Sequence, residues 1–324
     1  MESERHETPL APELADELCV FWEAAFSTSY ERFRSILAGE ELAHNRDVVY
    51  LVRHGDALAG TCHLTTPARS CRLGGLGEVA TAPAFRSRGI ATHLCRLARD
   101  EFRQSSGAAL FLGTGNPEAA RVYRGLGWCK LAGANVMVCV SGDESPEAFL
   151  VDYFREPGSV NAVAASAGMR IAMIPLLVFP HDDMVLDASA GMLSTRYAVQ
   201  HSCMGLYPRY ETLCEERSGS WFGAQTTNGR VVGLSTARLD ASSNCQVDAF
   251  VHWRFRECWD ELIETAVQWG VDAGAPTCWA RIARTEEGRR SLYEALGFCE
   301  TGPDGTFDVG GRQVDAVRLD RTVR

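Results

Sequence analysis

The chain has 324 residues, 46% hydrophobic and 23% charged, which is the profile of a soluble globular protein long enough for two domains. Its net charge of −10 argues against nucleic acid as a partner, because nucleic acid binds to a basic face. The first ten residues lack the basic start and apolar core of a secretory signal, and no apolar run could span a membrane, so we expect a cytoplasmic protein.

Twelve cysteines are scattered through the chain, and no two have the C-x-x-C spacing of a zinc ribbon or a thioredoxin-type site. Most lie inside apolar segments, such as Cys62, Cys139 and Cys299. We therefore expect free, buried thiols and no bound metal. Lys130 is the single lysine, so a lysine Schiff base has one position available and no motif supports it.

The first half of the chain shows strand and helix patterns in turn. Apolar residues recur at helical spacing over residues 14–37 and again over residues 89–102. The predicted elements, in chain order, are one or two helices over 14–37, strands at 48–53, 57–65 and 77–81, a helix at 89–102, a strand at 108–112, a helix from Asn116 to about 125, and a strand at 136–140. This order is typical of an α/β (α+β) domain with a mixed, mostly antiparallel sheet flanked by helices.

Residues 141–168 are rich in turn residues and mark a boundary, with a short helix predicted over 148–155. We expect a first domain at 1–145, a linker at 146–170 and a second domain at 171–324. The longest apolar run, residues 171–179, is interrupted by Pro175, and we interpret it as a buried strand.

Segments of the first half recur in the second, about 170 residues further on. The stretch VATAPAFRSRGIATHL (79–94) and the stretch VDAFVHWRFRECWDEL (247–262) share a valine, an aromatic residue, two arginines and a later leucine in register. YRGLGWC (123–129) recurs as YEALGFC (293–299), and the turn GDALAG is echoed by NGRVVG. The chain is therefore interpreted as two tandem domains of the same fold.

An arginine-rich loop, Arg86-Ser87-Arg88-Gly89, lies between a predicted strand and a predicted helix. The first amides of a helix lack internal partners and lie at the positive end of its dipole. A glycine there lets a phosphate approach the backbone, and the arginines add positive charge. Alone, this short pattern is also typical of a loop that begins a surface helix.

Together with NPEAARVYRGLGW (116–128), the stretch 79–94 resembles the GCN5-related N-acetyltransferase (GNAT) superfamily. Residues 79–94 are similar to the family's pyrophosphate motif, R/Q-x-x-G-x-G/A. Residues 116–128 are similar to its cofactor-side helix, in which an Asn and a Tyr flank the thioester. The resemblance covers most of residues 45–140 and, in degraded form, about 215–320. It implies a tandem member with a degenerate C-terminal copy and with acetyl-CoA as co-substrate.

The resemblance also implies which residues hold acetyl-CoA. The pyrophosphate would be bound by the backbone amides of Arg88, Gly89, Ile90, Ala91 and Thr92, with charge from Arg86. The strand from Val79 to Thr81 would pair with the pantetheine arm, and Asn116 would bond to the same region. Tyr123 would supply a proton to the leaving thiolate, although packing of the helix onto the sheet is an equally ordinary role for a tyrosine.

The amine that attacks the thioester must lose a proton, which calls for a base or a water relay. In the family, a Glu or His often projects at positions that match Gly75 or Gly77 here. The remaining candidates are Glu78, which strand alternation turns to the other face unless a bulge intervenes, and His63 on the neighbouring strand.

The second half departs from the motif at the positions that matter for binding. Glu257 stands at the Gly89 position and Trp259 at the Ala91 position, where a carboxylate repels a pyrophosphate and an indole blocks the backbone. We therefore expect no coenzyme A at the equivalent place in the second half.

These observations predict an N-acetyltransferase that moves acetyl from acetyl-CoA to a primary amine of a small molecule, such as a secondary metabolite or antibiotic. The alternatives are a non-catalytic protein that binds acetyl-CoA and a transferase that uses another acyl-CoA. The protein is expected to be a monomer or a homodimer.

Overall fold

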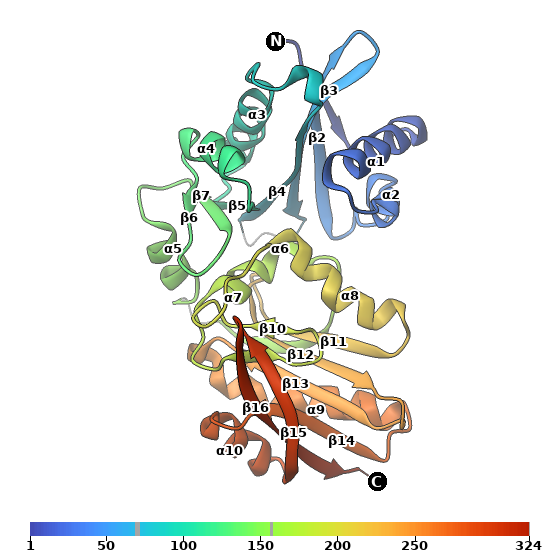
Figure 1. Ribbon diagram of the computed structural model, residues 1–324, viewed down its shortest axis with the longest axis vertical. Helices are drawn as coiled ribbons and strands as arrows, with labels where there is room; N and C mark the ends of the chain where they lie inside the picture. The colour runs from blue at the N-terminus through green and yellow to red at the C-terminus, as the bar shows by residue number, and fades with distance from the viewer. Residues whose placement is uncertain (69–71, 156–157, 324) are drawn as a thin grey trace.

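The computed structural model describes the chain except residues 69–71, 156–157 and 324. It contains two seven-stranded sheets, and the two halves of the chain are stacked along the long axis (Figure 1). In each sheet one neighbouring pair of strands is parallel and the other pairs are antiparallel, and helices flank both sheets. The predicted fold class is therefore confirmed.

The first half builds its sheet in the order β1-β2-β3-β4-β5-β7-β6. Its elements are β1 (Glu4–Glu7), α1 (Pro12–Phe26), α2 (Glu31–Leu37), β2 (Asn45–His54), β3 (Ala57–Pro67), β4 (Leu73–Thr81), the 3-10 helix η1 (Pro83–Phe85), α3 (Ile90–Gln104), β5 (Ala109–Gly113), α4 (Pro117–Gly125), β6 (Cys129–Lys130) and β7 (Val136–Val140).

The second sheet has the order β8-β11-β12-β13-β14-β16-β15, which matches the first sheet position by position. The elements are α5 (Pro146–Tyr153), β8 (Val160–Ala164), α6 (Met169–Ala172), α7 (Ile174–Val178), β9 (Val185–Asp187), β10 (Met192–Leu193), η2 (Met204–Leu206), α8 (Tyr207–Glu215), β11 (Gly219–Thr226), β12 (Val231–Leu239), β13 (Cys245–Val251), η3 (Trp253–Cys258), α9 (Trp259–Asp272), β14 (Thr277–Ala283), α10 (Glu287–Ala295), β15 (Cys299–Val309) and β16 (Arg312–Thr322). Strand β8 and helix α5 lie within the segment predicted as a linker, of which residues 156–157 are outside the described part.

Helices cover both faces of the first sheet, and this explains why β2 is apolar on both sides. Val48 and Tyr50 pack in the cluster that α3 completes with Leu94. Val49 lies in the opposite cluster, which α1 completes with Trp22. Figure 1 shows α3 and α4 on one side of the strands and α1 and α2 on the other. A strand buried on both faces reads as a continuous apolar run.

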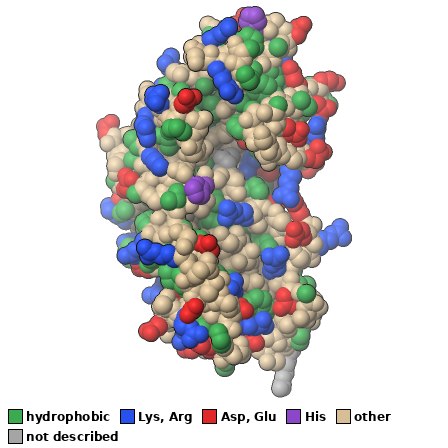
Figure 2. Space-filling view, viewed as in Figure 1, with side chains coloured by type: hydrophobic (Ala, Val, Ile, Leu, Met, Phe, Trp, Pro, Cys, Tyr) green, Lys and Arg blue, Asp and Glu red, His purple; other side chains and the backbone are tan. Residues whose placement is uncertain are grey.

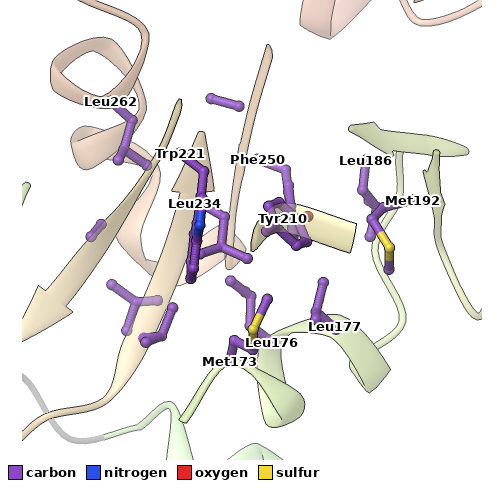
Figure 3. Packing of buried hydrophobic residues seen from close by; sticks show 14 of the residues in the cluster. Met173, Leu176, Leu177, Leu186, Met192, Tyr210, Trp221, Leu234, Phe250 and Leu262 are labelled. Atoms are coloured by element: carbon purple, nitrogen blue, oxygen red, sulfur yellow. The ribbon is translucent and has the colours of Figure 1, made fainter. Parts of the chain in front are cut away.

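The segment 171–179 was predicted to be a buried strand, and this prediction is wrong. It forms α6 and α7, and Pro175 lies in the first turn of α7, where its missing N–H has no cost. A short apolar run does not distinguish a buried strand from a buried helix. In Figure 3, Met173 and Leu176 gather with Leu234 and Phe250 in the core of the second half.

Most cysteines of the described residues are buried, Cys62 and Cys139 among them. Cys129, Cys214 and Cys299 are exposed, so the expectation of burial is wrong for Cys299. The reason is its position at the start of β15, an edge strand that has a neighbour on one side only. Cys71 lies outside the described residues.

Candidate active site

The first sheet is split where its two parallel strands separate. Strands β4 and β5 pair only from Leu73 to Gly75 on β4, and beyond that point they diverge. The divergence leaves a cleft of about 510 Å³. It is lined by residues 76–81 of β4, residues 112–116 at the end of β5 and just after it, α4, and Ala25 and Phe26 of α1. Backbone groups on this side of β4 are consequently available to a ligand.

A β-bulge directs Glu78 into this cleft. On β3, Thr61 pairs with Ala80 and His63 with Gly77, so two residues of β4 stand opposite one residue of β3. Glu78 takes the left-handed conformation, with φ of +47°, which is uncommon for a residue other than glycine. The bulge reverses the direction that simple alternation gives, and Glu78 lines the cleft.

The two residues named as alternative bases are hydrogen-bonded to each other. His63 Nδ1 lies 2.9 Å from Glu78 Oε2, and its Nε2 lies 2.8 Å from Asp47 Oδ1. His63 is fully buried and is not among the cleft-lining residues, whereas the side chain of Glu78 is 11% exposed. Of the two, only Glu78 is open to the cleft, and His63 lies behind it.

The environment of His63 fixes its charge. Burial alone lowers the pKa of His63, but the hydrogen bonds to Asp47 and Glu78 outweigh it and raise the pKa to about 9. Burial opposes ionisation of Asp47 as well, yet the charge of Arg170 and the hydrogen bond from His63 lower its pKa to about 2. At neutral pH the imidazolium therefore donates one hydrogen bond to each carboxylate.

The loop before α3 has the shape expected of an anion site. Ser87 and Gly89 are left-handed, with φ of +62° and +79°, and the first hydrogen bond inside the helix runs from His93 N to Gly89 O. The amides before His93 therefore open onto a second hollow of about 570 Å³, next to the cleft. The predicted residues that line this hollow are Thr81, Arg86, Gly89, Ile90, Ala91, Thr92 and Asn116.

The two arginines of this loop make different contacts. Arg86 Nε donates to Thr81 O at 3.3 Å, and Arg86 lines both the cleft and the hollow. The guanidinium of Arg88 lies 5.4 Å from the ring centre of Phe85 and is exposed.

Helix α4 closes the opposite wall of the cleft. Asn116 caps it, because its Oδ1 accepts hydrogen bonds from the amides of Glu118, at 2.9 Å, and Ala119, at 3.4 Å. Tyr123 is buried on the same helix and lines the cleft. Burial raises the pKa of Tyr123 above its ordinary value, so the phenol keeps its proton at neutral pH.

In the second half, the chain itself fills the corresponding split. Arg289 of α10 donates hydrogen bonds to the carbonyls of Val185 and Leu186 in β9. Glu286 Oε1 accepts from the amides of Met184 and Val185, at 2.6 and 3.2 Å. Residues 184–188 thus lie against β13 and α10, the elements that match the cleft walls β4 and α4.

Charge is distributed unevenly over the first half. On the face shown in Figure 2, acidic side chains gather over α1 and α2, and basic ones lie over α3 and α4. The exposed arginines of α3 and α4 include Arg96, Arg121 and Arg124. The basic side is the one that carries the loop before α3. The residues of α1 that line the cleft are Ala25 and Phe26, and the carboxylates that line it are Glu78 and Glu118.

Three residues near Glu78 were not predicted from the sequence: Asp47, Arg170 and Tyr30. Burial first, and the neighbouring Glu78 second, raise the pKa of Tyr30. Asp47 shares a strand face with Val49, so strict alternation along β2 could have indicated a buried carboxylate. Arg170 gives no such signal, because its partner belongs to the other half of the chain.

Among the residues that the structure describes, every helix is too short or too polar to cross a membrane.

Residues 11–128 match the model of the acetyltransferase (GNAT) family, which places a domain of this family in the first half of the chain. No curated protein matches the chain.

Several solved structures resemble between about a third and a half of the chain. A structure of an acetyltransferase from Acinetobacter baylyi, described as putative, shares 16% identity and a TM-score of 0.42, over 52% of this chain and 95% of that one. The phosphinothricin acetyltransferase of Sinorhizobium meliloti, solved with acetyl-CoA, shares 18% identity and a TM-score of 0.40, over 51% and 88%. A streptothricin acetyltransferase of Bacillus anthracis, also described as putative and solved with acetyl coenzyme A, shares 18% identity and a TM-score of 0.32, over 36% and 68%.

Proposed function

We propose that this chain is an N-acetyltransferase that moves the acetyl group of acetyl-CoA directly to a primary amine of a small molecule. The observation that carries the proposal is the continuity of the site. The anion loop before α3, the free side of β4 and the carboxylate of Glu78 lie along two adjoining hollows that share Thr81, Arg86 and Asn116.

The residues present fit a coenzyme A thioester. The amides from Gly89 to Thr92 suit a pyrophosphate, and a Cβ added to Gly89 would meet nothing within 4 Å, so the backbone there is open to a ligand. The unpaired side of β4 offers amides and carbonyls to the amide-bearing pantetheine arm. A β4 amide at the split is also the donor available to the oxygen on which negative charge develops during attack.

Glu78 and Tyr123 divide the proton transfers. Glu78 takes a proton from the attacking amine, directly or through one water, and the amine nitrogen forms its bond to the acetyl carbon. As the carbon–sulfur bond breaks, Tyr123 donates its proton to the leaving sulfur.

The second half is proposed not to bind coenzyme A. Residues 184–188 fill its split, and Glu257 and Trp259 replace the residues that leave the first loop open. We assign to this half a supporting role for the first, which makes the chain a tandem protein with a degenerate second copy.

A transferase for longer acyl groups is supported by one observation. A Cβ at Gly77 would meet no atom within 4 Å, so there is free space beside Glu78. The test is to measure turnover with a series of acyl-CoA donors of increasing acyl length. If the space accepts longer acyl groups, turnover will not fall as the acyl group lengthens.

The test is release of free coenzyme A from acetyl-CoA in the presence of a panel of primary amines, with the product identified by mass spectrometry. Glu78→Gln is expected to lower kcat by roughly 100-fold or more while acetyl-CoA affinity is kept. Glu101→Gln is the matched control, since it removes another hydrogen-bonded carboxylate, outside the cleft. Binding of acetyl-CoA without turnover of any amine would favour a non-catalytic acetyl-CoA-binding protein.

A further inference from the structure

The hydrogen bonds behind Glu78 continue across the boundary between the two halves. From His63 they pass to Asp47, whose two carboxylate oxygens accept from Arg170 Nη2 at 2.9 and 3.1 Å. The same Nη2 lies 3.1 Å from Glu41 Oε2. Arg170 belongs to α6, which packs against β3 and β4 of the first half.

We propose that Arg170 is a positioning residue for the reaction in the first half, acting through Asp47 and His63 to hold Glu78 in its place in the cleft. This inference rests on the proposed function, because it assigns Glu78 the proton transfer.

Burial separates this chain of contacts from an ordinary surface ion pair. The side chains of His63, Asp47 and Arg170 are 0%, 2% and 4% exposed. Replacing a buried ion pair by apolar residues is often neutral or stabilising, so stability alone gives little reason for this one. The halves already share an apolar cluster, in which Phe111 and Val138 of the first half join Met169 and Ile171 next to Arg170.

Negative and positive side chains alternate along this series of contacts, and Arg170 is needed to keep the series in its present geometry. The imidazolium of His63 lies between the carboxylates of Glu78 and Asp47. Arg170 lies between Asp47 and a third carboxylate, Glu41. Without Arg170, one imidazolium is left among three carboxylates in a buried site. Asp47 must then take a proton or turn toward water, and either change weakens its hold on His63.

Other contacts keep His63 in one orientation, so a change at Asp47 reaches Glu78 through the ring. Trp22 stacks on the His63 ring with centres 6.3 Å apart, and Phe33 meets its edge at 5.8 Å. Thr65 Oγ1 donates to Asp47 Oδ1 at 2.6 Å. Thr65 Oγ1 also lies 3.4 Å from His63 Nε2. With the ring held among these groups, a change in the charge of Asp47 is passed on as a change in the strength of the hydrogen bond from His63 Nδ1 to Glu78.

The test is a double-mutant cycle on kcat with Arg170→Met and His63→Gln. Arg170→Met is expected to lower kcat at least 10-fold with KM for both substrates within about 3-fold, and to change kcat less than 2-fold further in the His63→Gln background. Arg170→Lys keeps the positive charge and is expected to recover part of kcat. If Arg170→Met does not fold, Arg170→Lys takes its place in the cycle. Multiplicative effects of the two substitutions would overturn the inference.

The matched control is Arg289→Met. Arg289 is a buried arginine that is paired with a buried aspartate, Asp248. Both residues belong to the second half, whereas Glu78 belongs to the first. It is expected to cost stability and leave kcat unchanged. An equal loss of kcat in Arg289→Met and Arg170→Met would mean that both act only by loosening the second half, and the inference would fail.

A readout without turnover separates this inference from the proposed function. The imidazole NMR signals of His63, assigned by their absence in His63→Gln, are expected to titrate at a different pH in Arg170→Met and unchanged in Arg289→Met. If they titrate unchanged in Arg170→Met, the inference is wrong whatever the activity. If they move while the wild type acetylates no amine, the proposed function fails and the coupling between the halves stands.

Discussion

Tyr123 and Tyr293 stand at matching positions of the two halves but make different contacts. Tyr123 lines the open cleft, whereas the hydroxyl of Tyr293 donates to Asp248 Oδ1 at 3.0 Å in a fully buried site. We propose a role in chemistry for the first hydroxyl, whereas the second makes a structural contact. This contrast makes each tyrosine the control for the other.

We expect Tyr123→Phe to lower kcat by roughly 10- to 100-fold, because the leaving sulfur loses its proton donor, with little change in the free energy of unfolding. Tyr293→Phe is expected to do the reverse. It removes one of the hydrogen bonds to the buried Asp248 Oδ1, which Arg289 and the Ala249 amide also donate to, costs about 2 kcal/mol of stability, and leaves kcat unchanged. Steady-state kinetics and denaturant unfolding of both variants measure this. A Tyr123→Phe enzyme with full kcat would return Tyr123 to the role of a packing residue.

His63 links stability to pH with a definite sign. Its pKa is about 9 in the folded chain, against about 6.5 for an unperturbed histidine, so folding favours the protonated ring. The groups that face it are Asp47 and Glu78, with Arg170 behind Asp47. The contribution of His63 to the free energy of unfolding is fully present below about pH 6.5 and is lost as pH rises through 9.

The expected size of this contribution is up to about 3 kcal/mol. The difference in free energy of unfolding between wild type and His63→Gln is therefore expected to shrink between pH 6.5 and pH 9.5. Urea unfolding at both pH values measures it. A difference that does not depend on pH would show that His63 is neutral in the folded protein.

At the scale of elements, the loop before α3 is the part of the site that depends on one residue. Gly89 has φ of +79°, and a side chain there would project into the open hollow. Gly89→Glu is expected to lower acetyl-CoA affinity by at least 100-fold, because it adds both backbone strain and a carboxylate beside the pyrophosphate.

Gly274→Glu provides the matched control for the strain. Gly274 follows α9 with φ of +83° and also has no atom within 4 Å of an added Cβ. It should lose similar stability and keep its affinity for acetyl-CoA, as measured by calorimetry. Unchanged affinity in Gly89→Glu would place the pyrophosphate in another loop.

The sequence was sufficient for elements whose signals are local. The helix beginning at Asn116 and the loop around Gly89 follow from capping and conformational preferences of single residues. The sequence was insufficient where tertiary contacts determine the conformation of a segment or the direction of a side chain. The run 171–179 is helical because packing buries it on all sides, and Glu78 reaches the cleft because of a bulge that alternation does not predict. The role of Arg170 depends on a partner 123 positions away.

At the scale of the whole molecule, the two sheets have the same strand order but differ at the place where their two parallel strands separate. The first split is an open cleft, and the second is filled by residues 184–188, which Glu286, Arg289 and Asp248 hold through backbone hydrogen bonds. Arg289 stands where Ala119 lines the first cleft, and its long cationic side chain provides the contacts to the carbonyls of Val185 and Leu186.

The whole chain is therefore expected to bind one acetyl-CoA, and isothermal titration calorimetry measures the number of sites. Wild type should give a stoichiometry of one per chain, and Gly89→Glu should give no measurable binding, because the second split is filled and its loop carries Glu257 and Trp259. A stoichiometry of two, or one site that persists in Gly89→Glu, would mean that residues 184–188 leave the second split when coenzyme A is present. In that case the second half would be a binding site in its own right, since the inserted segment would compete with the ligand instead of replacing it.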